Sequence, residues 1–132
     1  MESLLKIAGV LMIGLALAHA VFPRYFKWKE ELRSITLLTR QVHYIHTFFI
    51  ALTVFLMGVL CVIRASELLT TSLGRELCLG MFVFWFSRLL VQFFGYSSSL
   101  WRGKTFETFV HVGFSILWAF LTLVLALAAL SR

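Results

Sequence analysis

The chain of 132 residues contains four histidines, whose imidazole nitrogens are common ligands of transition metals. His43 and His46 stand three residues apart, a spacing that puts both side chains on one face of an α-helix. Glu107 and His111 stand four residues apart and share a helical face in the same way. His19 lies alone near the N-terminus. These residue types and spacings suit a site for Fe, Zn or Cu, with imidazole and carboxylate ligands supplied by neighbouring helices.

The helices that would position these ligands are predicted to cross a membrane. Hydrophobic residues make up 61% of the chain and charged residues only 14%, a balance that excludes a soluble domain and a disordered chain. Four apolar stretches are long enough to cross a hydrocarbon core of about 30 Å, and they are residues 4–22, 38–63, 76–96 and 105–130. We therefore expect a single domain over residues 1–132, an all-α integral membrane protein with four transmembrane helices. Short connections favour an up-down-up-down bundle.

Basic residues predict the orientation of this multi-pass bundle. Seven Lys or Arg lie in or beside the first and third connections, namely Arg24, Lys27, Lys29, Arg33, Arg40, Arg102 and Lys104. Four lie at the opposite end, namely Lys6, Arg64, Arg75 and Arg132. The bias places the first and third connections in the cytoplasm and both termini outside, in a plasma membrane, although an inverted or dual orientation stays open. The first connection also reads as a short interfacial helix, because Trp28 accompanies its charges.

One end of the expected bundle collects all four histidines and the one arginine that lies deep within a span. His19 ends the first span, while the other three histidines begin the second and fourth, so antiparallel helices bring all four to the cytoplasmic end. Arg88 joins them from the third span, with Gln92 one turn further along the same face. Ser115 and Trp118 continue the stripe of the fourth span. Because lipid penalises polar side chains, we expect these stripes to face the inside of the bundle.

Two hypotheses assign a cofactor to this histidine cluster. The leading one is a metal ion, redox-active or not, whose candidate ligands are His19, His43, His46, Glu107 and His111. The second is b-type haem in an electron-transfer subunit, with one ligand from the second span and the other from His111. Arg88 or Arg40 would then pair with the haem propionates. Gln92, Ser115 and Trp118 would surround either site.

A third hypothesis needs no cofactor. Arg88 and the histidines would form a cationic pocket for an acidic lipid headgroup, or the chain would be an accessory subunit. A structural use of the same residues, with neutral imidazoles bonded between helices and Arg88 paired with Glu107, is also open. No reaction is predicted, because the chain lacks nucleotide-binding and hydrolase motifs. Cys61 and Cys78 are expected at the opposite face as free thiols, and a disulfide between them across the second connection is also open.

The expected partners follow from the composition and charge. The lipid bilayer is the main one, and a membrane partner subunit or a second copy of the chain is open. The net charge of +6 needs no nucleic acid, because basic residues beside anionic headgroups account for it.

Overall fold

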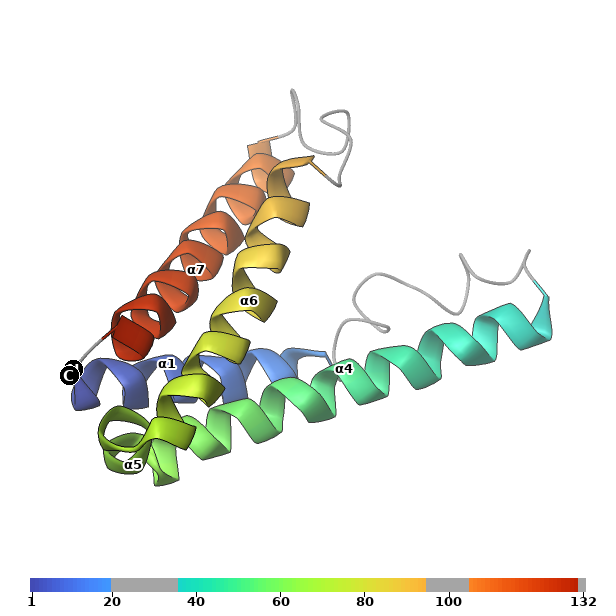
Figure 1. The fold of residues 1–132 in the computed structure, drawn as a ribbon. Helices are drawn as coiled ribbons and strands as arrows, with labels where there is room; N and C mark the ends of the chain where they lie inside the picture. Colours follow the sequence, from blue (N-terminus) through green and yellow to red (C-terminus); the bar gives the residue numbers. More distant parts are fainter. Residues whose placement is uncertain (20–35, 95–104, 131–132) are drawn as a thin grey trace. The chain divides into compact units, whose positions relative to one another are not determined.

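A computed structural model describes residues 1–19, 36–94 and 105–130, apart from the side chain of Glu107. Within these ranges the chain is helical and contains no strand (Figure 1). The helices are α1 (Glu2–Ala18), α4 (Leu37–Ile63), α5 (Ala65–Thr70), α6 (Ser72–Phe94) and α7 (Thr105–Leu130). The predicted interfacial helix in the first connection lies outside the described residues.

Three of these helices, α4, α6 and α7, are long and apolar enough to cross a membrane. They contain 27, 23 and 26 residues, which gives lengths of about 35–40 Å against a hydrocarbon core of about 30 Å. Large apolar side chains cover their outer surfaces, including Phe48, Phe93 and Phe109, which are 61%, 52% and 77% exposed. Continuous apolar surface of this extent is unfavourable in water and suits contact with lipid tails. The class of protein predicted from composition, an all-helical membrane protein, is therefore supported.

The first predicted span, residues 4–22, is described only in part. Helix α1 has 17 residues, or about 25 Å, and the residues from 20 onward lie outside the described ranges. The crossing of the bilayer by this helix stays a prediction, and so does the arrangement of four helices in one up-down-up-down bundle.

The chain divides into two compact units, and the first consists of Lys6–Ile63. Within it, α1 and α4 approach each other at glycine. A Cβ atom added to Gly58 would lie 2.6 Å from the carbonyl oxygen of Gly9, and one added to Gly9 would lie 2.7 Å from the carbonyl oxygen of Gly58. Real side chains do not tolerate such distances, so the absence of a side chain at both positions is what allows the two backbones to touch.

The second unit consists of Met1–Leu5 together with Arg64–Arg132. In it, α6 and α7 pack side by side along their lengths (Figure 1). They are antiparallel, because Trp85 contacts Trp118 while Gln92, further along α6, contacts His111, nearer the start of α7. This pairing brings the end of α6 to the beginning of α7.

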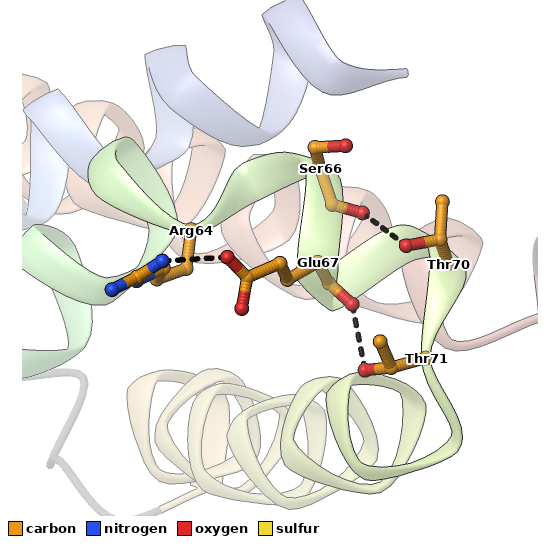
Figure 2. Close-up of polar contacts among 5 residues, drawn as sticks. All are labelled: Arg64, Ser66, Glu67, Thr70 and Thr71. Atoms are coloured by element: carbon orange, nitrogen blue, oxygen red, sulfur yellow. Dashed lines mark hydrogen bonds and ion pairs between the residues drawn. The ribbon is translucent and has the colours of Figure 1, made fainter.

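A short helix, α5, leads into α6 through a tight corner (Figure 2). Thr71 caps α6: its hydroxyl accepts a hydrogen bond from the backbone N–H of Gly74 at 2.9 Å and donates to the carbonyl oxygen of Glu67 at 2.8 Å. A Cβ atom on Gly74 would lie 2.5 Å from that same carbonyl oxygen, so the corner requires glycine. Arg64 pairs with Glu67 at 2.6 Å, and both side chains are exposed. Because of the cap, α6 begins at Ser72, before the expected start of the third span at Glu76.

Candidate functional site

A hydrogen-bonded network joins α6 to α7, and Gln92 lies at its centre. Its side chain is only 5% exposed. The amide oxygen accepts hydrogen bonds from the indole Nε1 of Trp118 at 3.2 Å and from an Nη1 of Arg88 at 3.4 Å. The amide nitrogen lies 2.9 Å from the Nδ1 of His111 and donates to the backbone oxygen of His111 at 3.3 Å. Arg88, Gln92, His111 and Trp118 therefore form one connected set, which we call the Gln92 network.

The directions of these hydrogen bonds follow from the chemistry of the partners. Indole and guanidinium groups only donate, so the amide oxygen of Gln92 must face Trp118 and Arg88. The amide nitrogen then faces His111 and donates to its Nδ1. We therefore assign His111 as a neutral imidazole that carries its proton on Nε2.

Aromatic rings surround the network on its apolar side. The ring of Trp118, 4% exposed, is stacked with Trp85 at 5.4 Å between ring centroids and with Phe114 at 5.5 Å. The guanidinium carbon of Arg88 lies 4.8 Å from the centre of the same Trp118 ring. A cation over an indole face is attracted by the negative face of the ring, most strongly where water is scarce. Trp118 thus fixes the position of the positive charge as well as the packing of the two helices.

Helical periodicity accounts for this meeting of side chains. Trp85, Arg88 and Gln92 recur at spacings of three and four on α6, which places them on one face. His111 and Trp118 are seven residues apart on α7, two turns along one face. The stripes predicted on the third and fourth spans meet at these four network residues, and their place inside a four-helix bundle stays a prediction. Trp85 was missed. Its position three residues before Arg88 was the available signal.

Ser115 takes a more local role than predicted. Its hydroxyl donates to the backbone oxygen of His111, one turn earlier in α7, at 2.8 Å. This bond satisfies the hydroxyl within its own helix. Ser115 therefore lies beside the Gln92 network without a described side-chain contact to it.

The remaining histidines lie in the unit Lys6–Ile63 and have separate surroundings. The Nδ1 of His19 is 2.9 Å from the backbone oxygen of Leu15 in the last turn of α1. The ring of His43 meets the ring of Tyr44 nearly at right angles, at 6.1 Å between centroids. His46 is exposed. Arg40 is partly buried in the first turn of α4, where its backbone N–H donates to Thr36.

The described residues contain no group of three or more His, Cys, Asp or Glu side chains placed to hold a metal ion. The side chain of Glu107, one predicted ligand, lies outside the described part of the structure. A site that would combine His111 with His43 or His46 would draw on both units and stays a prediction. Cys61 and Cys78 are both buried, and neither forms a disulfide among the described residues.

The Gln92 network lies toward one end of the two helices. Arg88 is six residues before the end of α6 and His111 six residues after the start of α7, about 9 Å along each helix. In helices of this length, that depth lies inside the apolar region but close to the headgroups. Comparison of the chain with protein-family models, with curated proteins and with solved structures finds no match.

Proposed function

We propose that this integral membrane protein binds the anionic headgroup of an acidic lipid through Arg88. The observation that carries the proposal is the placement of this guanidinium in an apolar helix, held against the Trp118 ring and the Gln92 amide. An ionisable side chain within a transmembrane segment is costly and marks a functional position by default. The cytoplasmic location of this end of the helices follows only from the basic residues and stays a prediction.

The chemistry of arginine favours a phosphate ligand. The planar guanidinium presents five N–H donors and binds phosphate oxygens through two parallel hydrogen bonds. Gln92 accepts from one of these nitrogens, and the Trp118 ring contacts the face of the group, so both side chains hold the guanidinium in position on α6. Cationic sites between helices near the headgroup level are typical of acidic-lipid binding.

The arrangement of His111 favours this function over metal or haem binding within α6 and α7. In the assigned tautomer, Nδ1 accepts from Gln92 and Nε2 carries the proton, so neither nitrogen offers a lone pair to a metal. Ligation through Nε2 would require the proton to move to Nδ1 and the hydrogen bond from Gln92 to break. His111 is better suited to holding Gln92, and through it Arg88, in place.

Substitution of Arg88 tests the proposal. In Arg88→Gln, phosphatidylglycerol bound to the detergent-purified protein, measured by native mass spectrometry, should fall about ten- to hundredfold, because charge-assisted hydrogen bonds are lost. Arg64→Gln is the matched control, since Arg64 is exposed and pairs with Glu67 in the corner before α6; it should bind as the wild type does. Equal retention in both variants would contradict the proposal. Displacement of the lipid by inorganic phosphate would identify a soluble anion as the ligand instead.

Metal and haem binding by the predicted histidines stay predictions with their own test. An absorption spectrum and elemental analysis of gently purified protein should show a Soret band for haem, or near-stoichiometric Fe, Zn or Cu for a metal. The spacing of His43 and His46 on α4 is what supports the metal. His43→Ala and His46→Ala should then remove it, while Arg88→Ala should not. Colourless, metal-free protein after supplementation with both would reject the two hypotheses.

A further inference from the structure

Trp85 carries a buried hydrogen-bond donor that the Gln92 network does not use. The residue is 2% exposed, and among the described residues its indole Nε1 has no hydrogen-bond partner. The neighbouring Trp118, by contrast, gives its indole N–H to Gln92. Buried polar groups in proteins are nearly always paired, so a donor without an acceptor calls for an explanation.

The position of Trp85 relates this donor to the proposed lipid site. Trp85 precedes Arg88 by three residues on the same face of α6, about 4.5 Å further from the end of the helix at Phe94. Both side chains contact the ring of Trp118, Trp85 by stacking and Arg88 through its cation. The guanidinium of Arg88 is therefore a cationic donor near the headgroups, and the indole N–H of Trp85 is a neutral donor about one turn deeper in the membrane.

We propose that the ligand is a diacyl glycerophospholipid, whose phosphate binds Arg88 while one ester carbonyl accepts a hydrogen bond from the Nε1 of Trp85. This inference rests on the proposed function and specifies its ligand. In such lipids the ester carbonyls lie one glycerol unit deeper than the phosphate, in the same order as the two donors on α6. The indole suits this boundary, because it combines an apolar ring with one polar N–H.

A carbonyl reaches the N–H of Trp85 only if a neighbouring side chain makes way. The ring of Phe84 lies edge-on to Trp85, at 5.0 Å between centroids, and is 37% exposed. Rotation of Phe84 is the movement that the inference requires. The stacking of Trp85 on Trp118 is retained in the bound state.

The test compares two lipids that differ only in their ester carbonyls. The wild-type protein should retain diacyl phosphatidylglycerol about three- to tenfold more strongly than the dialkyl ether analogue, the effect of one hydrogen bond. Trp85→Phe keeps an aromatic ring for stacking but removes the N–H, so its diacyl retention should fall to the level of the ether lipid. Its ether-lipid retention should equal that of the wild type. The inference would be overturned if the wild type showed no preference for the diacyl lipid, or if Trp85→Phe kept that preference.

A second measurement needs no variant. The indole proton of Trp85, observed by NMR in the full-length protein, should shift downfield with the diacyl lipid and stay in place with the ether lipid. An unchanged resonance with both lipids would contradict the inference.

Arg88→Gln separates the two proposals. If this variant loses both lipids while Trp85→Phe binds both as the wild type does, the proposed function stands and only the ester contact is wrong. Unchanged retention in Arg88→Gln would remove the proposed function itself.

Discussion

Trp118→Ala should lower the free energy of unfolding by about 3–5 kcal/mol, the range for truncation of a buried large aromatic residue. The ring is 4% exposed and is stacked with Trp85 and Phe114. Its removal opens a cavity between α6 and α7 and takes one donor from the amide oxygen of Gln92. It also removes the ring that holds the guanidinium of Arg88. Unfolding of the detergent-purified protein by increasing SDS, followed by circular dichroism, measures the change.

Two control substitutions separate the contributions of Trp118. Trp118→Phe keeps a stacking ring and loses the N–H, so most of the stability should be retained and the loss should be about 1–2 kcal/mol. Phe109→Ala removes an aromatic ring that is 77% exposed on the same helix, and the change should be within about 0.5 kcal/mol. A loss in Trp118→Ala no greater than in Phe109→Ala would show that the stack does not hold α6 to α7.

Gly58→Leu is expected to have the second large effect, through the contact of α1 with α4. The Cβ atom would meet the backbone oxygen of Gly9 at 2.6 Å and the side chain of Ile13 at 2.8 Å. Because a backbone oxygen cannot rotate away, the two helices must separate or shift. We expect a loss of about 3 kcal/mol or more, measured by the same SDS titration.

Gly14→Leu is the matched control for Gly58→Leu within the same unit. A Cβ atom at Gly14 has no neighbour within 4 Å among the described residues. Leucine also favours the helix over glycine by nearly 1 kcal/mol. Gly14→Leu should therefore be neutral or stabilising. Equal destabilisation by both substitutions would contradict the close packing of α1 on α4 at Gly58.

The features of the fold that could be predicted from the sequence are those that a lipid environment requires. Long apolar stretches correspond to α4, α6 and α7, because a membrane-spanning segment must be apolar and must satisfy its backbone within a helix. The polar stripe through Arg88 and Gln92 was expected to avoid lipid for the same reason. In the structure it meets the stripe through His111 and Trp118. Hydropathy and periodicity are sufficient for both inferences.

Other features depend on contacts that no periodicity encodes. Helix α5 has six residues, too few for a periodic pattern, and its junction with α6 depends on the cap by Thr71 and the space at Gly74. Trp85 resembles the many other aromatic residues of the spans until its stacking partner is known. The spacing of histidines places them on a helical face but does not identify the group opposite. For His111 the structure identifies the amide of Gln92.

A single distance decides whether Arg88 binds a lipid phosphate. Solid-state NMR on the protein in phosphatidylglycerol bilayers, with labelled arginine, measures dephasing of each guanidinium carbon by lipid phosphorus. We expect a separation of about 4–5 Å at Arg88, the geometry of guanidinium-to-phosphate hydrogen bonding, and loss of that signal in Arg88→Gln. An Arg88 carbon that shows no dephasing, in a sample where other arginines do, would contradict it.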